Sequence, residues 1–431
     1  MSNTLEIIKK SILVDGFHLD MDLSKSHGSY IYNKITQKEY LDWYTSFASC
    51  PIGYNHPRLV DLSKNLTTIF PNKIANSDIY TTEYAEFISN FRKTLPKNLR
   101  NHLFFLEGGS LAVENALKAA FDWKLQMCAK RKIVDENDLQ IIHFEEAFHG
   151  RSDYTLSLTN TDPNKTRGFP KFKWPRIANP KLKFKNGLID NLLEVIGLEN
   201  TAISQIEEYL KISPNTIAAC IIEPIQGEGG DNHFRPEFLY RLKKLSENYE
   251  FLLIFDEVQT GFGTTGKYWC FQHFNVEPDI LVFGKKSQIC GIAASSRLDL
   301  VDSVFKVSGR INSTWGGNLI DMVRCTELCK IYFETDILSN ASNVGNYILN
   351  GLIQYEDEFN VISNCRGKGM MIAFDLPNSQ IRDVFYNKCI DNFLICLKSG
   401  KRSIRFRPPL NLSYNEADEG LRKIHSSLTN N

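Results

Sequence analysis

The distribution of apolar residues along the chain predicts a set of buried β-strands. Residues 251–255 are five apolar residues in a row, and residues 280–283 are four. An apolar run of this length without alternation is typical of a strand that is covered on both faces. Residues 103–106, 141–144 and 217–222 are further strand candidates. The sequence therefore predicts a sheet that is buried on both sides.

Between these runs, apolar residues recur with helical spacing. Residues 110–128 carry Trp123 and several alanines on one face, and a later segment places Phe238, Leu242 and Leu245 on one face. This alternation continues to about residue 290, and it predicts an α/β fold with a mostly parallel sheet wrapped by helices. After residue 320 a helix is followed by short strands, which indicates a smaller lobe.

The composition argues against a nucleic-acid-binding or membrane protein. The 431 residues include 50 Lys plus Arg and 50 Asp plus Glu, so no overall field attracts the chain to a polyanion. No run approaches the ~20 apolar residues that span a bilayer, and residues 1–20 lack the apolar block of a signal peptide. Ten cysteines without a CxxC motif are typical of reduced thiols, so we expect a cytoplasmic protein. Cys325 and Cys329 could share a helix face, but no histidine is near, and no metal site is predicted.

Residues 160–185 differ in composition from the rest of the chain. Eight lysines and arginines accompany a single acid, Asp162, and aromatic residues are interleaved with them. Basic and aromatic residues together can bind single-stranded nucleic acid. Four prolines in the segment and the neutrality of the whole chain instead favour an ordered, extended loop.

Polar residues at the ends of two predicted strands indicate a possible reaction centre. Asp256 follows the run at 251–255, while Lys285 and Lys286 follow the run at 280–283. Open α/β sheets bind ligands at the C-terminal ends of their strands. An acid that keeps a pyridinium nitrogen protonated, and a lysine that carries an aldehyde as a Schiff base, would suit pyridoxal 5'-phosphate (PLP). The alternative is a capping acid and a surface lysine, and two residues alone do not decide between them.

Residues 261–267 match two nucleotide-binding patterns. Gly261, Gly263 and Gly266 fit GxGxxG, and Gly261 to Lys267 fit GxxxxGK. The second pattern needs Ser or Thr next to hold magnesium, but Tyr268 follows. The first needs its glycines directly after the strand, whereas five residues intervene. We therefore interpret these glycines as a flexible loop.

Four further segments have polar groups where predicted strands end. Gly108, Gly109 and Ser110 precede the 110–128 helix, whose N-terminus could bind a phosphate. Residues 148–151 (FHGR) offer an aromatic ring and an arginine, residues 223–228 (EPIQGE) offer two carboxylates, and residues 405–410 (RFRPPL) offer two arginines. Each is more simply structural on its own, but together they would lie at one sheet edge and form one pocket.

These segments carry a resemblance to a known family. The chain resembles the class III (ω-amino) aminotransferases over nearly its full length, through residues 148–151, 223–228, 256–261 (DEVQTG) and 313–318 (STWGGN). The resemblance implies PLP-dependent transferase fold type I, with a mostly parallel large domain and a smaller α+β domain. We expect residues 76–319 to form the large domain, with 1–75 and 320–431 contributing the small one.

The resemblance also implies roles around the cofactor ring. Lys286 would carry the cofactor as a Schiff base, with its neighbour Lys285 as the alternative anchor. Asp256 would pair with the pyridine nitrogen and Gln259 would reach the ring oxygen. Phe148 would stack on the face of the ring.

The phosphate and the substrates would be held by other residues. Gly109 and Ser110 would bind the phosphate together with Thr314 from the partner subunit of a homodimer. The substrate would be bound by Arg151 and Asn312, while Glu228 and Arg405 would form a switchable pair; no metal is implied.

At two places the sequence differs from most class III aminotransferases, and these differences narrow the range of possible amine donors. Leu111 replaces the usual glutamate, and residues 287–290 replace a glycine-rich run. Both are similar to the lysine 6-aminotransferase branch, which implies transfer of the terminal amine of L-lysine to 2-oxoglutarate. An ω-aminotransferase for ornithine, 4-aminobutyrate or a diamine is the closest alternative. A nucleotide-binding protein and a non-catalytic protein of the same fold are the others.

Overall fold

A seven-stranded sheet forms the centre of the computed structural model, which describes residues 3–64, 66–129 and 135–429. One strand, β13, is second in the sheet and runs antiparallel to both of its neighbours, whereas the other pairings are parallel. The strand order is β3 (His102–Leu106), β13 (Cys290–Ala294), β12 (Ile280–Phe283), β11 (Leu252–Asp256), β8 (Ile217–Ile222), β4 (Gln140–Phe144) and β5 (Arg176–Ile177). All five predicted strands are confirmed.

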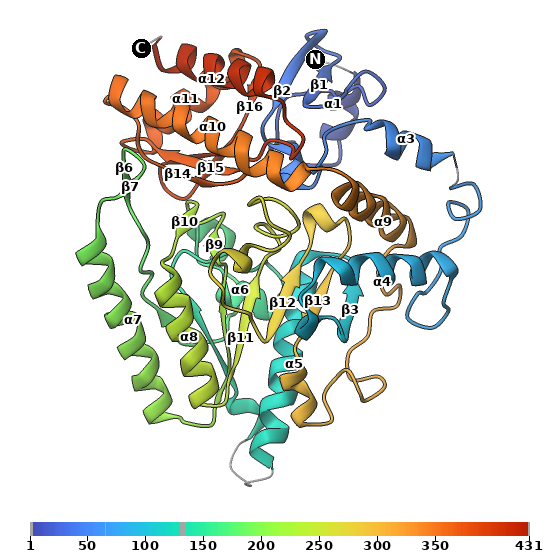
Figure 1. Cartoon of the computed structure of the whole chain (residues 1–431), viewed down its shortest axis with the longest axis vertical. Helices are drawn as coiled ribbons and strands as arrows, with labels where there is room; N and C mark the ends of the chain where they lie inside the picture. Colours follow the sequence, from blue (N-terminus) through green and yellow to red (C-terminus); the bar gives the residue numbers. More distant parts are fainter. Residues whose placement is uncertain (1–2, 65, 130–134, 430–431) are drawn as a thin grey trace.

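Helices cover both faces of this sheet, as the apolar runs predict (Figure 1). The helix α5 (Gly109–Ala129) packs on one face, where Ala116 shares an apolar cluster with Ile254. The helices α7 (Leu192–Ile212) and α8 (Pro236–Asn248) cover the other face, where Leu242 shares a cluster with Leu253. Because successive strand residues point to opposite faces, Leu253 and Ile254 are buried in different layers.

A second lobe contains both ends of the chain (Figure 1). Its antiparallel sheet has the order β14 (Ser363–Lys368), β15 (Met371–Asp375), β18 (Ser403–Phe406) and β17 (Leu397–Ser399). A three-stranded sheet joins β1 (Tyr30–Asn33) and β2 (Lys38–Asp42) to β16 (Leu394–Ile395), and so ties the N-terminal segment to the C-terminal one. Boundaries at 75/76 and 319/320 stay a prediction.

The remaining elements connect or cover these sheets. The longer helices are α4 (Thr82–Thr94), α9 (Leu319–Glu334), α10 (Ile337–Glu358), α11 (Ser379–Asp391) and α12 (Tyr414–Thr429). The shorter helices are α1 (Asn3–Lys9), α2 (Thr45–Ala48), α3 (Pro57–Ser63) and α6 (Asp153–Leu158). The short strand pairs are β6 (Phe184–Lys185) with β7 (Leu188–Ile189), and β9 (Ile225–Gln226) with β10 (Asn232–His233).

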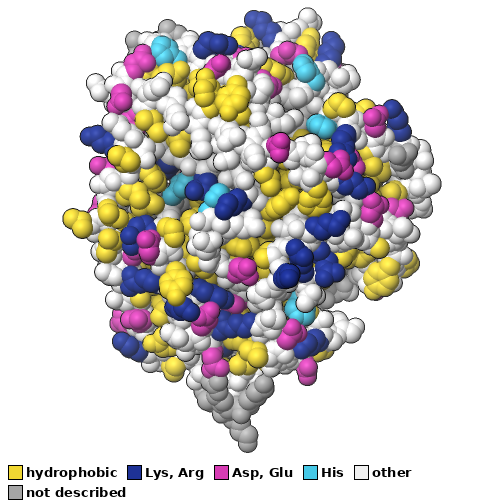
Figure 2. Space-filling model, viewed as in Figure 1, with side chains coloured by type: hydrophobic (Ala, Val, Ile, Leu, Met, Phe, Trp, Pro, Cys, Tyr) yellow, Lys and Arg dark blue, Asp and Glu magenta, His cyan; other side chains and the backbone are white. Residues whose placement is uncertain are grey.

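The basic, aromatic segment at 160–185 is an extended, largely irregular loop. It contains a short 3-10 turn, η3 (Pro163–Lys165), and the strands β5 and β6. Two of its aromatic rings stack together and reach a helix: the ring centroids of Phe172 and Trp174 lie 5.0 Å apart, and Trp174 lies 5.7 Å from Tyr154. On the face shown in Figure 2, basic and acidic side chains are interspersed. These contacts favour the extended loop over a nucleic-acid surface.

The glycine segment 261–266 is closely packed, so its interpretation as a flexible loop is wrong. A side chain at Gly263 would approach Leu410 to 2.6 Å, and one at Gly266 would approach Ser342 to 2.8 Å. Residues 261–265 are all buried. The glycines are needed because the second lobe packs directly on this turn, which leaves no room for a nucleotide phosphate.

The described ranges contain neither a membrane-spanning helix nor a metal-binding cluster. None of the helices there is long and apolar enough to span a bilayer. The same ranges hold no group of three or more His, Cys, Asp or Glu side chains arranged to bind a metal ion. All ten cysteines are free thiols.

Candidate active site

A cavity of about 300 Å³ lies where β4, β8 and β11 end and α5 begins. Its position agrees with the expectation that the polar segments converge at the C-terminal edge of the sheet. Six of the predicted site residues line it: Gly109, Ser110, Phe148, Arg151, Asp256 and Gln259. Seven further residues line it: Val113, His149, Gly150, Glu223, Val258, Lys285 and Cys290.

The acid at the centre of the cavity is oriented by a histidine. Asp256 is the last residue of β11 and is 5% exposed. Its Oδ2 lies 2.8 Å from Nδ1 of the buried His149, and its Oδ1 accepts a hydrogen bond from the Val258 NH at 3.1 Å. His149 belongs to the FHGR segment, but its position in the motif gave no sign of its partner. The two contacts fix which way the carboxylate faces.

Lys285 is the lysine of this cavity. It follows β12 at the start of a 3-10 turn, η5 (Lys285–Ser287). Burial lowers the pKa of Lys285 to about 8, assisted by the nearby Arg405, while Asp256 and Glu223 act in the opposite direction. At pH 7 an amine with this pKa is neutral in about one molecule in ten, compared with about one in a few thousand for an ordinary lysine. Lys285 is therefore available as a nucleophile.

Lys286 does not line the cavity, which disagrees with its selection from the sequence. Its side chain is 2% exposed, and its Nζ has no hydrogen-bond partner among the described residues. Burial, followed by the charges of Arg407 and Lys285, lowers the pKa of Lys286 well below its usual value. The backbone explains the placement, because Lys285 has a φ of 54° and the strand alternation ends before it. The structure thus brings Lys285, not Lys286, together with Asp256.

The N-terminus of α5 forms a cradle beside the lysine. The Ser110 hydroxyl lies 2.5 Å from the Ser152 hydroxyl and 2.8 Å from the Thr155 hydroxyl. Gly150 has a φ of 126°, and a Cβ there would come within 2.2 Å of Ser110 Oγ. A helix N-terminus that presents NH groups and hydroxyls is an anion site suited to a phosphate.

Glu223 supports the loop that carries Phe148. Its two carboxylate oxygens accept hydrogen bonds from the NH groups of Phe148, at 3.0 Å, and Gly227, at 2.9 Å. Burial, together with the charge of Asp256, raises the pKa of Glu223 to about 7 although His149 acts against the shift. The sequence predicted that this carboxylate lies at the C-terminal edge of the sheet. In the structure it binds the backbone NH groups of Phe148 and Gly227.

The two predicted substrate arginines differ in their surroundings. Arg151 is exposed on the cavity wall, and its guanidinium has no hydrogen bond or ion pair within the described part of the chain. Arg405, on β18, is 2% exposed and donates to Glu228 Oε2 at 2.5 Å and to Gln259 Oε1 at 3.2 Å. Gln259 also accepts from Arg407 at 2.8 Å. One arginine is thus free and the other is neutralised, although neither Arg405 nor Glu228 lines the 300 Å³ cavity.

Asn312 and Thr314 do not face this cavity within their own chain. Both are exposed. The backbone oxygen of Thr314 accepts a hydrogen bond from the Ser77 hydroxyl at 3.1 Å. Their predicted roles remain predictions.

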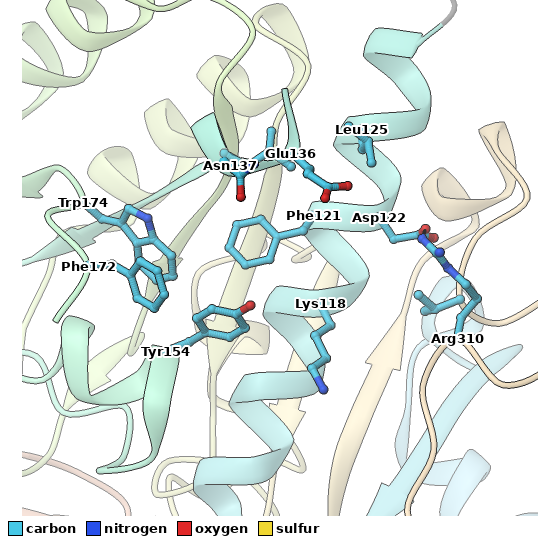
Figure 3. A pocket seen from close by; sticks show the side chains of 12 residues that line it. Lys118, Phe121, Asp122, Leu125, Glu136, Asn137, Tyr154, Phe172, Trp174 and Arg310 are labelled. Atoms are coloured by element: carbon cyan, nitrogen blue, oxygen red, sulfur yellow. Dashed lines mark hydrogen bonds and ion pairs between the residues drawn. The ribbon is translucent and has the colours of Figure 1, made fainter. Parts of the chain in front are cut away.

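Another cavity, of about 450 Å³, lies on the outer side of α5 and has different chemistry (Figure 3). Figure 3 shows the rings of Phe121, Tyr154 and Trp174 gathered on one side of it. Arg310 and Asp122 form an ion pair on the other side. Its described lining residues do not combine a buried carboxylate with a lysine of strongly lowered pKa, so the 300 Å³ cavity is the candidate active site.

The smaller cavity fits PLP. It holds an amine with a lowered pKa, a fixed carboxylate and an aromatic ring, supplied by Lys285, Asp256 and Phe148. The cradle at Ser110 would be filled by any side chain at Gly150, which accounts for the glycine. These are the groups needed for a pyridinium nitrogen, an aldehyde and a phosphate.

Known proteins are similar to the chain over its whole length. The model of the family "Aminotransferase class-III" matches residues 14–428. The chain is 43% identical to the L-lysine-epsilon aminotransferase of Amycolatopsis lactamdurans, over 98% of this chain and 95% of that protein. It is 32% identical to the 4-aminobutyrate aminotransferase of Dictyostelium discoideum, over 95% of this chain and 86% of that protein.

Solved structures show the same relationship. The lysine aminotransferase of M. tuberculosis in its internal aldimine form matches with a TM-score of 0.94 and 44% identity, covering 98% of each chain. The ornithine aminotransferase of Toxoplasma gondii matches with a TM-score of 0.81 and 22% identity, covering 99% of this chain and 93% of that chain, and shares the fold. The chain therefore has fold type I of the PLP-dependent enzymes, and it belongs to the class-III aminotransferases, which use PLP as their cofactor.

Proposed function

We propose that the enzyme transfers the terminal amino group of L-lysine to 2-oxoglutarate, giving 2-aminoadipate 6-semialdehyde and L-glutamate. The observation that carries the proposal is the pair of unlike arginines, one free at the cavity wall and one neutralised by Glu228. The 43% identity to a protein named L-lysine-epsilon aminotransferase supports the same substrate.

The two arginines suit two substrates of different shape. Lysine presents its terminal amine to the reaction centre, so its α-carboxylate lies at the far end, where Arg151 can bind it. 2-Oxoglutarate presents its α-keto carbon, which brings a second carboxylate close to the centre. Arg405 would bind that carboxylate after Glu228 moves away, and Arg151 would bind the distal one. Asn312 would add a substrate contact.

Bound PLP supplies an electron sink for the negative charge that develops on the substrate carbon when its proton leaves. Lys285 Nζ would hold PLP covalently, and the same amine would carry the proton between substrate atoms. Asp256 would hold a proton on the ring nitrogen, with His149 fixing its orientation. Ser110 and Gly109 would hold the phosphate, Gln259 the ring oxygen, and Phe148 the face of the ring.

A screen of amine donors with 2-oxoglutarate tests the proposed substrate. We expect L-lysine to give the highest kcat/KM, at least about tenfold above L-ornithine, 4-aminobutyrate and 1,5-diaminopentane, because only L-lysine spans the distance with a carboxylate at the correct end. Glutamate formation is measured for each donor at equal concentration. A higher kcat/KM for any other donor would assign a different ω-amine substrate.

We also propose a homodimer in which Thr314 binds the cofactor phosphate of the partner subunit. The proposal is supported by the exposure of Asn312 and Thr314 on their own chain. The protein is proposed to be cytoplasmic, in line with its ten free cysteines.

Thr314→Ala should raise the dissociation constant of PLP about tenfold, because one hydrogen bond to a charged phosphate is lost. Thr314→Ser, which keeps the hydroxyl, should bind PLP normally. Cofactor absorbance during dialysis gives the affinity, and sedimentation under assay conditions gives the assembly state. A fully active monomer would contradict the shared site.

A further inference from the structure

Glu228 contacts a second cation besides Arg405. The Lys165 ammonium donates to Glu228 Oε1, while the Arg405 guanidinium donates to Oε2 at 2.5 Å. The carboxylate therefore bridges two positive charges through different oxygens. No pattern in the sequence links the loop at residue 165 with the segment at 228.

The two cations differ in their exposure to solvent. The side chain of Arg405 is 2% exposed, whereas those of Lys165 and Glu228 are 18% and 24% exposed. Burial alone would raise the pKa of Glu228, but the charges of Arg405 and Lys165 outweigh it and keep the pKa below its usual value. The carboxylate is thus an anion between an inner, dry partner and an outer, partly hydrated one.

Glu228 and Lys165 also line a larger cavity next to the active site. This outer cavity, of about 880 Å³, gives the carboxylate room to move away from Arg405. Its other charged lining residues are Asp162, Arg382, Lys398, Lys401 and Arg402.

Lys165 is held in place by its own surroundings. It ends the turn η3, and its NH donates to the Asp162 carbonyl at 3.0 Å. Its ammonium lies 5.5 Å from the centroid of the Phe148 ring, over the ring face. The outer partner of Glu228 therefore does not depend on Arg405 for its position.

We propose that Lys165 is a positioning residue that retains the Glu228 carboxylate when Arg405 binds the keto acid. The inference rests on the proposed exchange of partners at Arg405. When Glu228 leaves Arg405, an ion pair with a buried guanidinium is broken, and a partly buried carboxylate without a cation is unfavourable. Because Lys165 already contacts Oε1, the carboxylate can turn about that contact toward the outer cavity and stay paired throughout. Lys165 thus favours the state that accepts a dicarboxylate.

Lys165→Met removes the charge and keeps the length of the side chain. We expect the rate constant of the 2-oxoglutarate half-reaction at subsaturating substrate to fall about tenfold, and that of the L-lysine half-reaction to change less than twofold. Lys165→Arg should restore at least half of the lost rate. Lys171→Met is the matched control, because in the described part of the chain the Lys171 ammonium contacts only the Thr166 carbonyl, at 3.0 Å, in the same loop.

Both half-reactions are followed by single-turnover absorbance of the holoenzyme. Enzyme reconstituted with pyridoxamine phosphate starts the 2-oxoglutarate half-reaction without any amine donor, so Lys165 can be tested even if L-lysine is the wrong donor. A wild-type enzyme that does not react with L-lysine overturns the proposed substrate alone. Calorimetric binding of glutarate to the PLP form adds a readout without turnover, and we expect about tenfold weaker binding for Lys165→Met.

A Glu228→Gln background separates an action through Glu228 from a direct contact with substrate. There, Lys165→Met should change the 2-oxoglutarate rate less than twofold, since the two substitutions act on one interaction. The proposal is overturned if Lys165→Met slows both half-reactions equally or neither. It is also overturned if the full tenfold loss persists in the Glu228→Gln background.

Discussion

Lys285→Met should reduce transamination by about 10³-fold or more, whereas Lys286→Met should retain activity within about fivefold. The first substitution removes the proposed attachment point and proton carrier, and general acid–base groups of this kind contribute ~10²–10⁴-fold. The second replaces a buried amine, which lies outside the cavity and has no partner among the described residues, with an apolar chain of similar length. Steady-state rates with L-lysine and 2-oxoglutarate measure both effects.

Borohydride reduction of the holoenzyme followed by peptide mapping identifies the attachment point directly. We expect the label on Lys285 in the wild type and in Lys286→Met, and no label in Lys285→Met. Thermal unfolding of both variants separates loss of chemistry from loss of fold. Label on Lys286, or a Lys285→Met enzyme with near-normal activity, would return the assignment to Lys286.

The pattern of the sequence predicted the sheet and the edge at which the site lies. The apolar runs form strands of the seven-stranded sheet, because a strand covered on both faces tolerates few polar residues. Asp256 ends β11 as expected. Parallel strands carry their C-terminal ends to one edge, so the segments at Ser110, Phe148 and Asp256 converge there.

The choice between two adjacent lysines could not be made from periodicity. Alternation of side chains holds only within a strand, and β12 ends at Phe283. Beyond it, Lys285 adopts a left-handed conformation with a φ of 54°, which for a residue other than glycine is set by tertiary packing. Its side chain therefore points where no strand or helix pattern would place it.

Contacts between distant segments were the other part that periodicity does not encode. His149 and Asp256 are 107 residues apart, and Lys165 and Glu228 are 63 apart. Each residue type also occurs on ordinary surfaces, so neither pair stands out in the chain. The partners became visible only when the loops after separate strands were placed in space.

Substitutions of Glu228 and Arg405 should affect different half-reactions. Arg405 is nearly fully buried, and during the lysine half-reaction no substrate carboxylate is near to balance its charge. Glu228 balances it in the structure, at 2.5 Å. Without Glu228, a buried cation would lie beside the aliphatic chain of lysine, which costs several kcal/mol in a dry site.

We therefore expect Arg405→Ala to lower kcat/KM for 2-oxoglutarate about 10²-fold or more, which corresponds to the ~2–5 kcal/mol typical of removing one member of a buried charge pair, and to leave the L-lysine half-reaction within about tenfold. Glu228→Ala should show the opposite preference and chiefly weaken the use of L-lysine.

Arg151→Ala should impair both half-reactions, because the far carboxylate of either substrate would lose its cation. Single-turnover absorbance of each half-reaction, with Arg405→Lys as the variant that keeps the charge, measures the division. Undiminished turnover of 2-oxoglutarate by Arg405→Ala would refute the exchange of partners, since Arg405 is the only buried arginine among the described residues that contacts Glu228.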